Sequence, residues 1–443
     1  MKRELTSGSV MKNLLFFSLP YLLSFFLQTL YGMADLLIIG QFGSVADTTA
    51  VSVGSQVMHM LTVMIVGLAM GATVNIGQAV GGKDSRKAAL FTGNTVTLFM
   101  GLSVTLTFLL LILRNTIVSA VSTPADAAAG TVDYLTICFI GIPFITAYNI
   151  ISAVFRGMGD SKSPMYFIAV ACAANIALDY LFIGALGMGP AGAALGTVLS
   201  QAISVIISLI VIKRRSTGLA LTKADIRPNK QIIGKILKIG IPVAMQDGFI
   251  QIAFMVITVI ANRRGLNDAA AVGIVEKIIG FLFLVPSSML SAVSALGAQN
   301  IGAGKIKRAK HALFTGIGIG LTVGCVVFVL VMFKGDLLAG FFTTDVAVIQ
   351  RAFEYLRGFG AETIVTAILF SMIGYFNGNN KTVWVMTQGL IQTLLVRLPF
   401  AYVMSIQPNA SLTKIGLAAP VSTTVGVIMN VIFFIYMNRK KEQ

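Results

Sequence analysis

The sequence predicts an all-α polytopic membrane protein with twelve transmembrane helices in two parallel six-helix lobes. Three observations predict this fold: an apolar composition, apolar segments of membrane-spanning length, and an internal repeat. The chain has 443 residues, of which 56% are hydrophobic and 11% charged, and its mean hydropathy is +0.86. Soluble domains carry roughly 25% charged residues. Helices are expected because they satisfy their own backbone hydrogen bonds in lipid.

The apolar segments recur along the whole chain. The first follows Lys2, Arg3 and Lys12, as in a signal peptide, but its apolar part is too long and further spans follow, so a retained helix is expected. The expected spans are 14–37, 53–79, 90–112, 134–155, 164–186, 191–212, 239–261, 271–297, 312–333, 355–376, 382–405 and 416–437.

The basic residues predict the topology. The net charge of +16 arises mostly from Lys and Arg in alternate loops and in both tails. This asymmetry is the positive-inside pattern, which places both termini in the cytoplasm and makes binding of nucleic acid unnecessary as an explanation. Attraction to anionic membrane lipid is a by-product. The opposite loops hold few basic residues: Arg114, Arg263, Arg264, Lys334, Arg351 and Lys414.

Four motifs recur in the same order in both halves. "SLPYLL" from Ser18 matches "GIPVAM" from Gly240, and "GQAVGGKDSRKAALFTG" from Gly77 matches "AQNIGAGKIKRAKHALFTG" from Ala298. "YLTICF" matches "YLRGFG", and "FRGMGDSK" matches "FNGNNK". Six spans per copy make the copies parallel, related by a pseudo-two-fold axis along the membrane normal.

The expected domains are an N-terminal lobe 1–212, a basic cytoplasmic linker 213–238 and a C-terminal lobe 239–443. Such lobes are typical of alternating access.

The residues that would indicate other classes of protein are scarce. Cys138, Cys172 and Cys325 lie in apolar spans without metal-ligand spacing, and the two histidines, His59 and His311, are isolated. No phosphate-binding glycine loop and no catalytic constellation is evident. We therefore expect neither an enzyme nor a cofactor.

Polar residues at membrane depth predict an ion site in the N-terminal lobe. Asp179 lies in "NIALDYLFIG", about 22 Å into its span at 1.5 Å per residue. Asn175 precedes it by one helical turn, so both side chains share a face. Thr197 and Asp35 are expected at a similar depth, and Pro20 is a natural bending point of the first span.

This pocket of two carboxylates, one amide and one hydroxyl suits H⁺ or Na⁺, because two buried acids cannot both stay charged without a counter-ion. The alternative is that Asp35 reaches interfacial water and Asp179 makes a helix-packing hydrogen bond.

The C-terminal lobe lacks an acidic copy of this pocket, since its matching segment reads "RLPFAYV". Its polar residues allow two interpretations, lining of a central cavity or structural pairing with Arg357 or Arg397. Glu276 is expected to pack or gate rather than to touch substrate. The candidate cavity-lining residues are Gln246, Asp247, Glu362 and Arg397.

These motifs, with "SLPYLLSFFLQTLYGMADLLIIGQFG" and "FRGMGDSKSP", resemble the multidrug and toxic compound extrusion (MATE) transporters over nearly the whole chain. One prokaryotic branch, which includes DinF-like proteins, has a cation site at the positions of Asp35, Asn175, Asp179 and Thr197. The resemblance implies antiport, in which inward H⁺ or Na⁺ drives export of organic, often cationic and amphipathic, compounds. It also implies bending of the first helix at Pro20.

Two alternatives share parts of this pattern. A lipid-linked precursor or polysaccharide flippase of the same superfamily has the fold but tends to carry a more basic cavity, and a major-facilitator transporter has a different basic motif after its second span. We expect a monomer in the plasma (inner) membrane of a prokaryote. The substrate and the choice between H⁺ and Na⁺ stay open.

Overall fold

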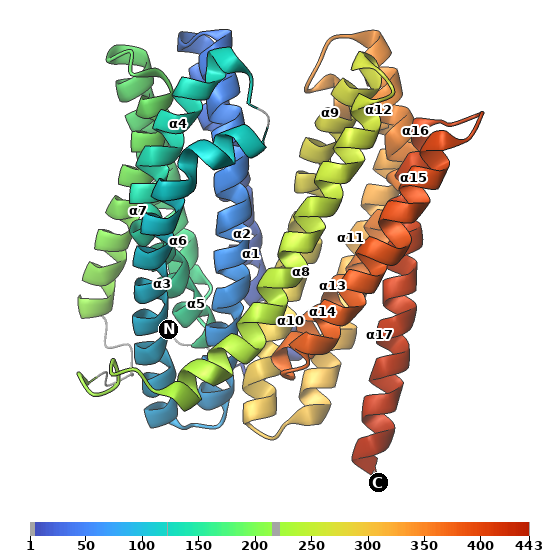
Figure 1. Ribbon diagram of the computed structural model, residues 1–443. Coiled ribbons are helices and arrows are strands. Elements are labelled where there is room, and N and C mark those ends of the chain that lie inside the picture. The colour runs from blue at the N-terminus through green and yellow to red at the C-terminus, as the bar shows by residue number, and fades with distance from the viewer. Residues whose placement is uncertain (1–4, 122, 215–221, 443) are drawn as a thin grey trace. The chain divides into compact units, whose positions relative to one another are not determined.

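The computed structural model describes residues 5–121, 123–214 and 222–442, and within these ranges it contains helices and no strand (Figure 1). Nine helices are long and apolar enough to cross a membrane, and three bent helix pairs raise the number of spans to twelve among the described residues. The predicted fold class is confirmed, and each predicted span lies within one of these helices or pairs, except that the span 164–186 extends one residue beyond Ala185. Residues 215–221 of the predicted linker lie outside the described ranges.

The elements follow in chain order. They are α1 (Val10–Phe42), α2 (Val45–Gly81), α3 (Ser85–Ala120), α4 (Ala125–Ile140), α5 (Ile142–Gly157), α6 (Lys162–Asp179), η1 (Tyr180–Ala185), α7 (Gly189–Arg214), α8 (Lys230–Asn262), α9 (Leu266–Leu282), α10 (Leu284–Gly302), α11 (Ile306–Gly340), α12 (Val346–Phe359), α13 (Glu362–Gly378), α14 (Thr382–Leu390), η2 (Ile391–Arg397), α15 (Leu398–Ile406), α16 (Leu412–Gly416) and α17 (Ala418–Glu442).

Three spans are bent rather than straight. The pairs α4–α5, α9–α10 and α12–α13 bend by 51°, 41° and 50°. Pro143 lies in the first turn of α5, and Pro286 lies near the start of α10. A proline cannot donate the backbone hydrogen bond that would continue the preceding helix, so the break falls just before it. At the third bend the helices are separated by Gly360 and Ala361 instead.

The chain forms two compact units. Unit 1 contains residues 19–244, and unit 2 contains residues 5–18 and 245–443. Unit 1 has apolar clusters centred on side chains such as Phe91, Phe155 and Phe139, and the cluster of unit 2 includes Tyr355 and Phe359. These units follow contacts, whereas the predicted lobes follow the sequence repeat, so the lobe boundaries stay a prediction.

Two helices carry the chain from one unit to the other. In α1 the change falls between Ser18 and Leu19, and in α8 it falls between Ala244 and Met245. Both helices have 33 residues and an internal proline, Pro20 in α1 and Pro242 in α8. In each helix the proline therefore lies within three residues of the change.

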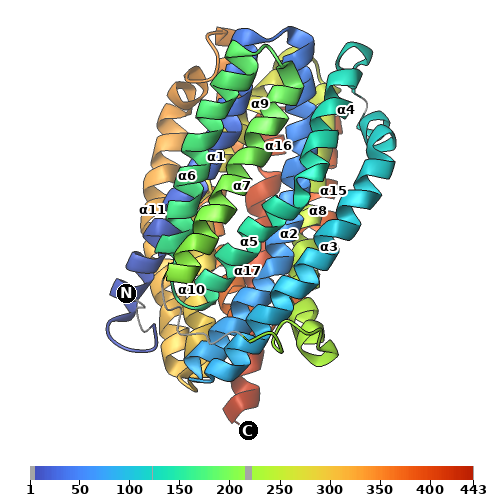
Figure 2. The same ribbon diagram turned by 90° about the vertical axis from the view of Figure 1, so that its left-hand side faces the viewer.

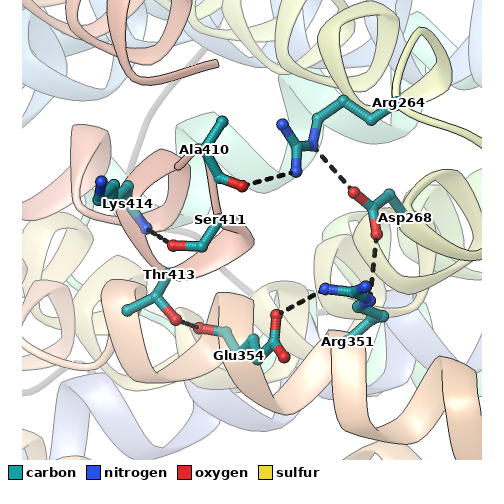
Figure 3. Close-up of polar contacts among 8 residues, drawn as sticks. All are labelled: Arg264, Asp268, Arg351, Glu354, Ala410, Ser411, Thr413 and Lys414. Carbon is teal, nitrogen blue, oxygen red and sulfur yellow. Dashed lines mark hydrogen bonds and ion pairs between the residues drawn. The ribbon is translucent and has the colours of Figure 1, made fainter. Parts of the chain in front are cut away.

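A polar network ties the loops at one end of unit 2 (Figure 3). Asp268 accepts a hydrogen bond from Arg264 Nε at 2.9 Å and lies 3.6 Å from Arg351 Nε, and Arg351 in turn pairs with Glu354 at 3.2 Å. Arg264 also donates to the carbonyl of Ala410 at 3.1 Å. This network joins the α8–α9 loop, α12 and the α15–α16 loop.

Candidate functional site

The predicted acid and amide of α6 lie on one buried face. Asn175 and Asp179 are both fully buried, and α6 packs along α7 within unit 1 (Figure 2). Asp179 is the last α-helical residue before the π-helical turn η1. Such insertions are frequent at functional sites, because they turn a side chain away from its regular helical direction.

Gly196 of α7 makes room for these side chains. A Cβ at this position would overlap Asp179 Oδ1 and would lie 3.6 Å from Asn175 Nδ2. The next residue, Thr197, donates its hydroxyl to Asp35 Oδ2 at 3.2 Å across unit 1. The fold thus brings Asp35, Asn175, Asp179 and Thr197 together, and we call this set the N-lobe pocket.

The N-lobe pocket holds more acceptors than donors. Asp35 Oδ1 and both carboxylate oxygens of Asp179 are buried without a hydrogen-bond partner among the described residues, and so are both polar atoms of the Asn175 amide. Asp35 is only 3% exposed, and Asp179, Asn175 and Thr197 all interact with it electrostatically. Buried acceptors without donors are costly, so this arrangement calls for a proton or a cation.

A second buried polar cluster lies in unit 2 and is formed by side chains of α14, η2, α17 and the start of α13. It is a continuous series of hydrogen bonds that ends on Glu362. We call it the amide chain, and its members are Trp384, Asn430, Gln388, Gln392, Thr423 and Glu362.

The amide chain resembles the N-lobe pocket in the way its polar side chains pack against a glycine of a neighbouring helix. Gln388 and Gln392 are one helical turn apart, as Asn175 and Asp179 are. A Cβ at Gly426 of α17 would overlap Gln392 Oε1 and would lie 2.5 Å from Gln388 Nε2. Gly426 follows Pro420 in α17 by the same six residues that separate Gly196 from Pro190 in α7.

Sequence reasoning missed Gln388 and Gln392 because it compared acids only. A neutral amide in an apolar span costs less free energy than an aspartate and is therefore a weaker signal. The sequence repeat also matches "RLPFAYV", rather than "QGLIQ", with the segment that contains Asn175 and Asp179. A one-turn spacing of two glutamines, "QGLIQ", within a predicted span is the signal that would have identified them.

The structure also places the other candidate residues of the C-terminal lobe. Asp247 is half-buried, and Gln246 is buried against Gly389 of α14. Arg397 is 6% exposed and stacks over the ring of Phe254 at 4.9 Å.

Among the described residues Glu362 forms no ion pair with Arg357 or Arg397, although Arg397 lies near enough to act on it electrostatically. Arg357 instead stacks over Phe353 at 4.4 Å. Glu276 accepts a hydrogen bond from the Thr258 hydroxyl at 2.5 Å, which is a contact between neighbouring helices.

Pro20 lies inside a continuous helix. The Ser24 hydroxyl donates to the Pro20 carbonyl at 2.8 Å, a bond to the carbonyl four residues earlier of a kind that often bends helices. Bending at Pro20 stays a prediction.

A multi-pass helical protein whose spans enclose acids and amides has the architecture of a membrane transporter, because polar groups at membrane depth mark pathways for ions and substrates. The chain belongs to the MatE family, whose model matches residues 20–181 and 242–403. The two matched ranges reflect the internal repeat seen in the sequence.

Two relatives are similar to most of the chain, and one solved structure has the same fold. The chain is 24% identical over 449 residues to the probable multidrug resistance protein YoeA of Bacillus subtilis, covering 98% of this chain and 95% of YoeA. It is 25% identical over 388 residues to the multidrug export protein MepA of Staphylococcus aureus, covering 86% and 85%. A transporter of the MOP superfamily from Pyrococcus furiosus has the same fold, with a TM-score of 0.94 at 21% identity, covering 99% of this chain and 98% of that one.

Proposed function

We propose that this transporter is a secondary active antiporter that exports organic compounds, cationic and amphipathic, in exchange for inward H⁺ or Na⁺. The observation that carries the proposal is the N-lobe pocket, in which the buried carboxylates of Asp35 and Asp179 lie close enough to interact and three of their four oxygens lack a hydrogen-bond partner among the described residues. A bound proton or Na⁺ would supply the missing positive partner, and the coupling ion is cargo rather than a resident cofactor.

Each residue of the pocket has a role in this proposal. Asp179 and Asp35 carry the charge that the ion neutralises, and Thr197 orients Asp35 through its 3.2 Å hydrogen bond. Asn175 supplies a neutral oxygen ligand from the same helical face as Asp179.

The coupling of ion entry to substrate export follows from thermodynamic linkage between the two binding events. The ion binds the pocket in one lobe conformation, and the substrate binds the other conformation better, so each ligand biases the same equilibrium in opposite directions. Small molecules as cargo are supported by the multidrug relatives YoeA and MepA. The N-lobe pocket and the amide chain contain acids and amides, so we do not propose an anionic lipid-linked cargo. We propose that the transporter works as a monomer in a prokaryotic plasma membrane, surrounded by lipid.

The test is efflux of a fluorescent lipophilic cation from proteoliposomes, under an imposed pH gradient and separately under a Na⁺ gradient. Asp179→Asn should abolish the gradient-driven part of efflux, because an amide cannot take up a proton near neutral pH and lacks the negative charge that a carboxylate offers to Na⁺. Asp133→Asn, which changes an exposed acid of α4, is the matched control and should keep wild-type efflux. Equal efflux by wild type and Asp179→Asn would return Asp179 to a packing role.

A further inference from the structure

The hydrogen bonds of the amide chain all point in one direction. The Trp384 indole N–H donates to Asn430 Oδ1 at 2.8 Å, and Asn430 Nδ2 donates to Gln388 Oε1 at 3.4 Å. Gln388 Nε2 then donates to Gln392 Oε1 at 2.5 Å. Gln392 Nε2 donates to Thr423 Oγ1 at 3.1 Å, and the Thr423 hydroxyl donates to Glu362 Oε1 at 2.9 Å.

The two ends of the amide chain fix this direction. An indole nitrogen can only donate, and an ionised carboxylate can only accept, whereas the amides and the hydroxyl between them can do both. Only one orientation of the intermediate groups therefore satisfies both ends. Hydrogen bonds aligned in this way polarise one another and strengthen as a series, most of all where they end on a charge.

The amide chain is sealed from water over most of its length. Asn430 and Gln388 are fully buried, and Gln392 is the most exposed of the intermediate members at 9%. In a low-dielectric interior a change in charge at one end is poorly screened. Trp384 and Gln392 are eight residues apart, which corresponds to about 12 Å along the helix at 1.5 Å per residue.

The amide chain also fixes how Glu362 is presented. Its Oε1 atom is held by Thr423, and its Oε2 atom is buried without a hydrogen-bond partner among the described residues. The charged or titratable side chains that interact with Glu362 are Arg397 and Tyr355, and the Thr366 side chain also acts on its carboxylate. Glu362 is thus oriented through its Oε1 atom, which the Thr423 hydroxyl holds.

We propose that the amide chain is a positioning network for Glu362, and that it transmits the charge state of Glu362 to Trp384. The residues from Thr423 to Trp384 do not touch a ligand in this proposal; they act through Glu362. Trp384 is the reporting end, because it is half-buried and stacks on Phe433 at 4.2 Å. This proposal stands independently of the N-lobe pocket, since all of its residues lie in unit 2.

The chain carries its own probe, because Trp384 is the one tryptophan in the sequence. The experiment compares the fluorescence emission maximum of purified, monodisperse protein in detergent for four proteins: wild type, Glu362→Gln, Thr423→Val and the double variant. Glu362→Gln should shift the emission of Trp384 in the wild-type background. In the Thr423→Val background the same change should produce no further shift, because the link is already broken.

Two matched controls separate transmission from general loosening. Glu276→Gln removes another acid of the same unit, one bonded to Thr258, and should leave the emission maximum unchanged. Thr424→Val removes a neighbouring hydroxyl that bonds to the Pro420 carbonyl within its own helix, and should also leave it unchanged.

The outcomes are decisive in both directions. No shift with Glu362→Gln, or an equal shift in the Thr423→Val background, would overturn the proposal. If Glu362→Gln does not yield monodisperse protein, Gln392→Leu interrupts the amide chain with Glu362 intact. A shift with Gln392→Leu then supports transmission, and an unchanged emission maximum rejects it.

Discussion

At the scale of single residues, two glycines decide where polar groups can enter the apolar helix packing. Gly196 and Gly426 each lie opposite a one-turn pair of polar side chains, Asn175 and Asp179 in one unit and Gln388 and Gln392 in the other. Any larger residue would take the volume that the polar atoms occupy. The conformational freedom of glycine is irrelevant here, since both positions are helical.

We predict that Gly196→Ala displaces Asp179 and disrupts the N-lobe pocket. The new methyl group would overlap Asp179 Oδ1, so the carboxylate must move. Disturbing the support of an ion ligand typically costs about 10–100-fold in affinity. The measurement is the concentration of coupling ion that gives half-maximal gradient-driven efflux, which should rise by a factor in this range.

Gly32→Ala is the control for this prediction. Gly32 lies in α1, the helix that carries Asp35, and a Cβ there meets nothing within 4 Å. Its ion dependence should match wild type. A wild-type ion dependence for Gly196→Ala would show that Asp179 does not contribute to ion binding.

The acidic pocket was predictable from the sequence and its neutral counterpart was not, and the reason is energetic. A charged side chain at membrane depth costs several kcal/mol, so Asp35 and Asp179 stand out within their apolar spans and require an explanation. Gln388 and Gln392 cost less, and they do not stand out in the same way. Their significance depends on Gly426, which comes near them only through the folding of α17 against η2.

At the scale of elements, polar side chains hold the segments that precede α1 and α8. Arg308 donates to the carbonyls of Ser7 and Gly8, both at 2.7 Å, within unit 2. In unit 1, Arg86 pairs with Asp225 of the predicted linker at 2.7 Å, and Asn94 accepts from the backbone N–H of Asn229 at 2.7 Å. Both segments are therefore anchored before their helix begins.

We predict that Asp225 gives this anchoring a pH dependence. Hydrogen bonds from the Thr222 backbone N–H and hydroxyl, together with the Arg86 guanidinium, lower the pKa of Asp225 below its ordinary value of 3.8. A lowered native pKa stabilises the anchored state above pH 3.8, and this stabilisation is lost as the pH falls through the lowered pKa. Asp225→Asn should therefore speed proteolytic cleavage within 213–238 at neutral pH.

The difference between wild type and Asp225→Asn should disappear at a pH below the lowered pKa, where an acid-active protease gives the comparison. Asp84→Asn controls for loss of a nearby acid, because Asp84 caps α3 by accepting a hydrogen bond from the backbone N–H of Lys87. If the cleavage rates of wild type and Asp225→Asn differ as much in acid as at neutral pH, the charge of Asp225 does not contribute to the anchoring.

The prolines of α1 and α8 lead to another element-scale prediction. Pro20 and Pro242 each lie where a helix passes between compact units. A mid-helix proline disfavours the helix by about 3 kcal/mol relative to alanine, so both mark places where bending costs little. Pro20→Ala and Pro242→Ala should each raise thermal stability by about 1–3 kcal/mol and slow efflux several-fold.

Pro190→Ala is the control for both proline variants, because Pro190 is in the first turn of α7, where a proline does not break the helix. It should transport at the wild-type rate. Unchanged efflux by Pro20→Ala and Pro242→Ala would exclude bending at these prolines as a step of transport.

The spans were predictable and the bends only partly so. Apolar segments of membrane length are visible in any hydropathy pattern, so every span appeared in the sequence. The bend before Pro143 follows from a rule, since proline ends the preceding helix. The bend between α12 and α13 has no proline, and it depends on packing that the sequence does not show.

At the scale of the whole molecule, the distribution of charge predicts an orientation. Basic residues gather in alternate loops, as the positive-inside pattern requires for a chain with both termini in the cytoplasm. The anchors at Arg86 and Arg308 then lie on the cytoplasmic side, and the network around Asp268 lies on the outer side. In the proposed antiport the coupling ion would enter from the side of the Asp268 network.

Cysteine labelling checks this orientation. The background replaces Cys138, Cys172 and Cys325 with alanine, and single cysteines are then introduced as Asn409→Cys or Lys307→Cys at two exposed positions. A membrane-impermeant maleimide applied to intact cells should label Asn409→Cys and leave Lys307→Cys unlabelled. In inside-out vesicles the pattern should reverse, because the cytoplasmic loops then face the reagent. The opposite result in both preparations would invert the topology, and the Asp268 network would then face the cytoplasm.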